Sequence, residues 1–256
     1  MNAFHLLQGS VIGREHARVG RNNQDAAVAR RRPDAIAAVV ADGCSSGRFS
    51  EIGARLGATF LAEHLAATRP EDAAGLDASA RALRAFLRSL SLDLLQRDPA
   101  GLAAAVHDHL LFTVLGAVVT PARALVFGVG DGVFSLNGEA TVIDPGPDNA
   151  PPYIGYDLLP SREAGGERAG TAFTVHLDVP TAKVQTLLVG TDGLVDLMQR
   201  AHEPLKNGEP QGGLAQFEVD DALFKSPLLL QKRLVVIGEA NRRLRDDTTV
   251  IVLRRA

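Results

Sequence analysis

Two apolar runs that each end at an aspartate constrain most strongly what this chain can fold into. The first run covers residues 35–41 and is followed by Asp42; the second covers 187–190 and reaches Asp192 one residue later. A glycine follows each aspartate. A short apolar run bounded by turn residues is typical of a strand buried on both faces. The sequence therefore predicts two buried strands, each with a carboxylate at its C-terminal tip.

Two further acids lie beside strand-like segments. Asp25 precedes the short strand predicted over 26–30, and Asp246 precedes the closing strand predicted over 248–253. Taken one at a time, ordinary turn or helix-capping roles account for acids in such places. Taken together, they indicate a divalent-cation site, because Mg²⁺ and Mn²⁺ prefer oxygen ligands.

Helical periodicity predicts two long helices between the strand groups, over 49–67 and 78–96. The large apolar residues of the first helix recur at helical spacing and predict its buried face: Ile52, Leu56, Phe60, Leu61 and Leu65. The polar segment 13–23 is expected to be a loop. Two more helices are expected late in the chain, over 214–223 and 228–244.

Short β-prone runs between residues 111 and 143 predict a meander of antiparallel strands. Asn137-Gly138 between two such runs is a strong hairpin signal. Strand groups separated by long helices favour α+β layers over strict βαβ alternation. The Gly- and Pro-rich residues 144–170 predict a mobile excursion over one end of the fold. Without a linker or repeat, residues 1–256 are expected to form one domain.

Composition narrows the class of protein. A hydrophobic content of 46% supports a sizeable core rather than disorder. The net charge of −3, without a basic cluster, argues against nucleic acid as the principal partner. One cysteine, Cys44, excludes an intrachain disulfide. Without a secretory leader or an apolar run of spanning length, we expect a cytoplasmic protein with no membrane partner.

The same acids fall within five motifs that occur in the order typical of one family. The chain resembles the metal-dependent protein phosphatases of type 2C (PPM), and its opening and Asp42-Gly43-Cys44-Ser45-Ser46 stretch resemble a bacterial branch. The resemblance spans about residues 9–253. The matching segments are 20–26, 40–43, 128–132, 188–196 and 246–252, with Gly132 in place of the usual serine of the third motif.

The resemblance implies a fold and a chemistry. The fold is a four-layer sandwich of two stacked antiparallel sheets flanked by helix pairs, with metals in a cleft at one end. The chemistry is hydrolysis of phosphoserine and phosphothreonine by in-line attack of a hydroxide that bridges two Mn²⁺ or Mg²⁺ ions, so no nucleophilic side chain is needed. The excursion at 144–170 corresponds to a variable flap beside the cleft.

The resemblance also implies a role for each acid. Asp42 would bridge two metals, with the Gly43 carbonyl on one of them. Asp192 and Asp246 would complete the shell of one metal, and Asp25 would lie near the other and bind it directly or through water. Some members hold a third, weaker metal where Asp131 and Asp196 fall here, together with Asp192.

Three departures from the family pattern concern the site. Gly20 stands where the phosphate-binding arginine often lies, and we predict that Arg21 replaces it, with Arg14 and Arg18 as substitutes or all three as ordinary surface residues. Gln24 replaces the glutamate beside Asp25, which removes one charge. Cys44 replaces a histidine suggested as a proton donor. His16 is a candidate to compensate, although a lone loop histidine is usually polar surface.

The motifs predict a Mn/Mg-dependent phosphoprotein phosphatase as the first hypothesis. Its partners would be proteins phosphorylated on serine or threonine, together with a cognate kinase in bacterial signalling. The alternative is a catalytically weak or inactive phosphatase-like regulator that binds a protein partner, a hypothesis motivated by Gln24 and the displaced arginine. A metallohydrolase acting on small phosphate esters is a third hypothesis.

Overall fold

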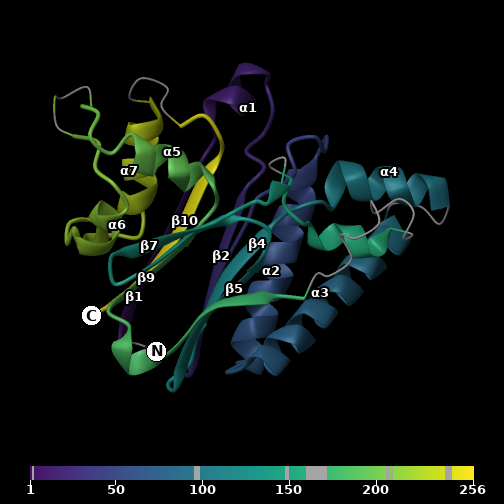
Figure 1. Ribbon diagram of the computed structural model, residues 1–256, viewed down its shortest axis with the longest axis horizontal. Helices are drawn as coiled ribbons and strands as arrows, with labels where there is room; N and C mark the ends of the chain where they lie inside the picture. The colour runs from purple at the N-terminus through teal and green to yellow at the C-terminus, as the bar shows by residue number, and fades with distance from the viewer. Residues whose placement is uncertain are drawn as a thin grey trace.

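The computed structural model describes residues 1, 3–94, 99–147, 150–159, 172–205, 208, 210–239 and 244–256. Two five-stranded antiparallel sheets lie face to face between two groups of helices (Figure 1). The first sheet has the order β1 (Phe4–Val11), β10 (Thr248–Arg255), β9 (Thr186–Gly190), β6 (Gly132–Leu136) and β7 (Glu139–Ile143). The second has the order β2 (Ala26–Arg32), β3 (Ala35–Ala41), β4 (Val114–Val119), β5 (Arg123–Val129) and β8 (Thr174–Pro180).

One group of helices covers each outer face (Figure 1). Against the second sheet lie α2 (Ser50–Thr68), α3 (Ala73–Leu94) and α4 (Pro99–His109). Against the first sheet lie α5 (Gly193–Gln199), α6 (Ala215–Val219) and α7 (Leu229–Glu239). Short 3₁₀ turns cover Ile154–Leu158, Thr181–Lys183 and Leu223–Lys225. The predicted α+β sandwich with flanking helices is therefore confirmed.

Strand β3 shows why its sequence is apolar without alternation. Ile36, Ala38 and Val40 point into the layer between the two sheets. Ala37 and Val39 point to the other face, where they pack with α2 and α3. All seven residues of β3 are buried, since the strand has a packed layer on both sides.

The predicted buried face of α2 is wrong in part. Leu61 and Leu65 are buried, but Ile52 and Leu56 are 45% and 37% exposed. The face toward the sheet is instead rich in small residues, Gly53, Ala54, Gly57, Ala58, Ala62 and Ala66. A Cβ at Gly57 would lie 2.4 Å from the ring of Phe112. The helix packs so close to β2–β4 that large side chains do not fit between them.

Two boundaries also differ from the sequence expectations. Residues 13–23 are not all loop, because α1 (Arg14–Arg18) forms within them. Helix α3 begins five residues before the predicted start at 78, and the predicted end at 96 lies outside the described residues. None of the helices in the described part of the chain is both long and apolar enough to cross a membrane.

The excursion at 144–170 is only partly described, because residues 148–149 and 160–171 lie outside the described ranges. Its middle part is packed: Ile154 is fully buried and Leu158 is 7% exposed, both in the apolar core beside α3 and α4. A Cβ at Gly155 would lie 2.2 Å from the carbonyl oxygen of Leu110. Residues 150–159 are therefore held against the helical layer.

Candidate metal centre

Strand pairing brings the four predicted acids to the same end of the sandwich. In the second sheet, Ala26 pairs with Ala41, so Asp25 and Asp42 directly follow the last pair of the β2–β3 ladder. In the first sheet, Val250 pairs with Gly190, which places Asp192 and Asp246 beyond the matching ends of β9 and β10. Both pairs lie at the end marked by α1, opposite the chain termini (Figure 1).

A small cavity of about 90 Å³ joins acids from both sheets. Four carboxylates line it: Asp42, Asp131, Asp192 and Asp246. Asp131 comes from the turn between β5 and β6, where the chain passes from one sheet to the other. The remaining walls are His16, Gly43, Cys44, Ser45, Thr113, Pro151 and Tyr153. The structure thus brings together the predicted Asp42, Gly43, Asp131, Asp192 and Asp246.

Asp25 and Asp196 lie beside this cavity instead of lining it. Asp25 is 4% exposed, and its Oδ2 accepts a 2.7 Å hydrogen bond from the Thr191 hydroxyl. Asp196 lines a neighbouring, more open cavity of about 280 Å³ together with Asp192 and Asp246. Its Oδ2 accepts a 2.8 Å hydrogen bond from the backbone N–H of Arg245. Asp192 and Asp246 therefore border both cavities.

The carboxylates lie close enough to disfavour one another's ionisation. Burial raises the pKa of Asp42 well above its ordinary value, and the charges of Asp25 and Asp192 raise it further. Burial, followed by the charges of Asp131 and Asp246, raises the pKa of Asp192 to about 7. Loss of solvation likewise raises the pKa of Asp25, Asp131 and Asp246. So many like charges in one place need either protons or a cation.

The donor set fits a hard divalent cation. One oxygen of Asp25 and one of Asp192, Oδ1 in each case, are buried without a hydrogen-bond partner. An ionised oxygen left unpaired in a protein interior is costly, and a cation would satisfy it. Carboxylate and carbonyl oxygens are the ligands that Mn²⁺ and Mg²⁺ take in proteins.

Two close backbone contacts hold the acidic segments together. A Cβ at Gly193 would lie 2.0 Å from the carbonyl oxygen of Asp247, and one at Gly13 would lie 2.2 Å from the carbonyl carbon of Asp246. Both positions therefore require glycine. Gly193 stands in a predicted motif, whereas Gly13 was missed, because only the folded chain shows which backbone it approaches.

Gln24 has a structural role in the loop beneath the cavity. It is 1% exposed, and its Nε2 donates to Ser50 Oγ at 2.7 Å and to the Gly47 carbonyl at 3.2 Å. Its own carbonyl accepts from the Gly43 N–H at 3.2 Å. Gln24 thus anchors the loop that carries Gly43, and its side chain does not line the cavity.

The predicted phosphate-binding arginines lie outside the cavity wall. The guanidinium of Arg21 donates to the carbonyl of Ser45, a wall residue, while its side chain is exposed. Arg14 and Arg18 both pair with Glu15, at 2.8 and 3.3 Å. Within the described residues, the cavity has no arginine or lysine in its wall.

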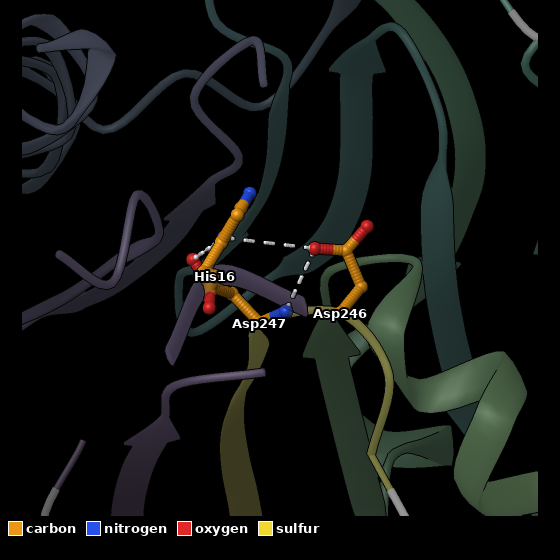
Figure 2. Close-up of side chains that lie close together, drawn as sticks. All are labelled: His16, Asp246 and Asp247. Carbon is orange, nitrogen blue, oxygen red and sulfur yellow. Dashed lines mark hydrogen bonds and ion pairs between the residues drawn. The ribbon is translucent and has the colours of Figure 1, made fainter. Parts of the chain in front are cut away.

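Asp247 is a buried functional candidate that sequence reasoning missed. It is 2% exposed, and its carboxylate accepts from the N–H groups of Gly13 at 2.7 Å and Gln24 at 2.6 Å. Its Oδ2 also lies 2.9 Å from Nδ1 of His16. Figure 2 shows this pair beside Asp246, whose Oδ1 is 4.0 Å from the same nitrogen. Adjacent acids were the available signal, but a solvated turn explained them equally well.

Tyr153 and Cys44 form a further part of the cavity wall. Burial raises the pKa of the Tyr153 phenol, and its hydrogen bond with Cys44 adds to that effect. The Cys44 sulfur also lies 3.1 Å from the hydroxyl of Ser46. Because Tyr153 belongs to the excursion at 144–170, that segment reaches the cavity.

The comparisons with known proteins assign the family. Residues 12–214 match the family described as Protein phosphatase 2C, and the chain belongs to this family. A search among curated proteins gives no match.

Solved bacterial structures share the fold over nearly the whole chain. The serine/threonine phosphatase Stp1 from Staphylococcus aureus is 14% identical, with a TM-score of 0.60 and coverage of 98% of this chain and 94% of its own. The catalytic domain of the serine/threonine phosphatase PstP with two manganese ions is 15% identical (TM-score 0.53; 98% and 97%). RsbX with magnesium is 13% identical (TM-score 0.50; 99% and 96%). At these identities the likeness establishes the fold.

Proposed function

We propose that this protein is a Mn²⁺- or Mg²⁺-dependent phosphatase that hydrolyses phosphoserine and phosphothreonine in proteins. The observation that carries the proposal is the convergence of four carboxylates, from separate segments of both sheets, on one cavity. Family membership and solved relatives that hold manganese or magnesium support it. Phosphoprotein substrates imply a kinase that makes them, and a cytoplasmic location would suit this role.

Each acid has a place in the proposed centre. Asp42 would hold two cations and the Gly43 carbonyl one of them, and Asp192 and Asp246 would complete the shell of one cation from the other sheet. Asp25 would contribute from below, through its unpartnered oxygen. When bound, such cations neutralise phosphate charge and make water a stronger nucleophile at neutral pH. Asp131 and Asp196 flank Asp192 and are the proposed ligands of a third, weaker ion.

The part of the cavity wall formed by residues 151 and 153 would contact the substrate. Pro151 and Tyr153 present apolar surface and a half-buried phenol to the cavity. They belong to the excursion at 144–170, whose proposed role is the choice of peptide around the phosphorylated residue. Arg21, exposed and tied to the rim at Ser45, is proposed to meet the phosphate from the cavity mouth.

Metal-dependent turnover tests the proposal. The full chain should hydrolyse p-nitrophenyl phosphate and a phosphothreonine peptide with Mn²⁺ and lose this activity in EDTA. Asp42→Asn should lower turnover by about 100-fold or more, since it removes the shared ligand. Asp220→Asn, an exposed acid far along the chain, is the matched control. Turnover that survives EDTA or Asp42→Asn would reject the proposal.

The described cavity wall contains no arginine or lysine that could bind a phosphate group, and this favours a second candidate function. A phosphatase-like regulator would bind a phosphorylated partner without efficient turnover. It predicts tight binding of a phosphoprotein by both the parent and the Asp42→Asn variant, with no metal-dependent hydrolysis by the parent. Turnover of the phosphopeptide by the parent would exclude it.

A further inference from the structure

We propose that His16 supplies its Nε2 as a nitrogen ligand to the divalent-cation centre, held in place by Asp247. The inference rests on the proposed function only in taking the acidic cavity to be a metal centre. It would add a histidine to the proposed oxygen ligands and so change which cation the centre prefers.

The position of His16 is fixed by the backbone hydrogen bonds of its helix and by the burial of its ring. It lies in α1, and the first N–H groups of that helix donate to the carbonyls of Leu244 and Arg245, at 2.9 and 3.0 Å. These carbonyls directly precede Asp246 in the chain. The imidazole is 11% exposed, so it has little freedom to leave the cavity wall. A loop histidine with an ordinary surface role would not be held in this way.

Asp247 orients the ring so that one nitrogen is left over. Its carboxylate already accepts two backbone N–H groups, and its Oδ2 lies 2.9 Å from Nδ1 of His16. In the neutral imidazole, Nδ1–H then donates to the carboxylate and Nε2 keeps its lone pair. Nε2 lies at the end of the ring away from Asp247 (Figure 2). Metal-bound histidines characteristically donate their other N–H to a carboxylate in this way.

The neighbouring groups point to a cation at this place. His16 shares the cavity wall with Asp42, Asp192 and Asp246, and its ring lies beside Asp246, whose Oδ1 is 4.0 Å from Nδ1. Asp192, which lines the same cavity wall as His16, has a buried Oδ1 without a hydrogen-bond partner. That unpaired oxygen is independent evidence that a positive charge belongs in this cavity.

A nitrogen ligand gives the centre a distinct metal preference. Imidazole binds transition metals far better than Mg²⁺, whose preferred ligands are oxygens. The centre should therefore bind Mn²⁺ more tightly than Mg²⁺ by a larger factor than an all-oxygen site would. Replacing His16 should reduce that factor mainly by weakening Mn²⁺.

The variant His16→Asn separates the two roles of the ring. The amide nitrogen of asparagine lies near the position of Nδ1 and can still donate to Asp247, whereas nothing remains at the position of Nε2. The matched control is His64→Asn, because His64 lies on α2, stacked on Phe60 away from the cavity. Thermal unfolding in EDTA should show both variants folded.

Mn²⁺ electron spin-echo spectroscopy reads the ligand directly, independent of turnover. With Mn²⁺ bound, the full chain should show a strongly coupled nitrogen that changes when histidine is labelled with ¹⁵N and disappears in His16→Asn. Titration calorimetry should show the dissociation constant for Mn²⁺ raised by about tenfold or more in His16→Asn. That for Mg²⁺ should change less, and His64→Asn should match the parent in both measurements.

The outcomes are distinct. Bound Mn²⁺ without a histidine nitrogen, or equal losses of Mn²⁺ and Mg²⁺ affinity in His16→Asn, would overturn the role of His16 and leave the proposed function standing. A parent chain that binds no Mn²⁺ would overturn both. If His16→Asn fails to fold, the ¹⁵N-histidine experiment on the parent still decides, since it needs no variant.

Discussion

The metal-free protein should become less stable as pH rises, and Asp192 should account for a measurable part of the loss. Its pKa is 3.8 in an ordinary aspartate and about 7 in the fold, because burial and nearby acids disfavour its charge. Below pH 3.8 the carboxyl is protonated whether the chain is folded or unfolded. Between 3.8 and about 7 the unfolded chain releases this proton first, so rising pH favours unfolding.

The magnitude follows from the difference in pKa. About three pKa units at 1.36 kcal/mol per unit correspond to at most about 4 kcal/mol. The variant Asp192→Asn cannot ionise there. Relative to the parent, it should therefore gain stability from near zero at pH 4 to as much as about 4 kcal/mol at pH 7.5.

Urea denaturation in EDTA at several pH values measures this difference. Asp220→Asn, which removes an exposed carboxylate, should follow the parent at every pH. Adding Mn²⁺ at pH 7.5 should reverse the order, because a bound cation offsets the repulsion in the parent and the variant has lost a ligand. A difference between Asp192→Asn and the parent that stays constant from pH 4 to 7.5 would refute the electrostatic reasoning.

Three further predictions follow from packing and hydrogen bonding. Gly53→Ala would place a Cβ 2.1 Å from a backbone oxygen at the end of α4, so urea denaturation should show the free energy of unfolding lowered by about 1–3 kcal/mol. The control Ile52→Ala, at a half-exposed position, should lower it by about 0.5 kcal/mol or less. A larger loss in Ile52→Ala than in Gly53→Ala would contradict the packing of α2. Gln24→Glu would bury another negative charge and should lower the melting temperature in EDTA without raising Mn²⁺-dependent turnover; a gain in turnover would mean that glutamine weakens the centre. Thr191→Val removes the 2.7 Å hydrogen bond to Asp25. Urea denaturation should show the free energy of unfolding lowered by about 1–3 kcal/mol, and calorimetry should show weaker Mn²⁺ binding. Unchanged values in both assays would contradict the role of Thr191 in positioning Asp25.

Sequence alone predicted the central strands, such as β3, because their burial is visible in residue type. The run at 35–41 is apolar at every position since both its faces are covered, and the hairpin at Asn137-Gly138 follows from a local turn preference. The buried face of α2 was not predictable in the same way. Periodicity of large residues identifies the side where bulk gathers, whereas this helix turns its glycines and alanines to the sheet.

The acids of the site were predictable because they stand at strand ends, and antiparallel pairing brings those ends together. The residues that surround these acids were not predictable. Asp247 and Gly13 act through contacts with chain segments more than 200 residues away, and no local pattern encodes such a contact. The roles of Arg21 and Gln24 likewise depend on which carbonyl or hydroxyl lies within reach, here those of Ser45 and Ser50.

The cavity takes its acids from both sheets, and this has a mechanical consequence. A cation bound by Asp42 from one sheet and by Asp192 and Asp246 from the other would link the two sheets at one end of the sandwich. Such a link would lie at the end of the sandwich near α1, away from the chain termini (Figure 1). Chelation should therefore loosen the protein unevenly, so that amide exchange accelerates first in the segments around Asp42 and Asp192 and last near the termini.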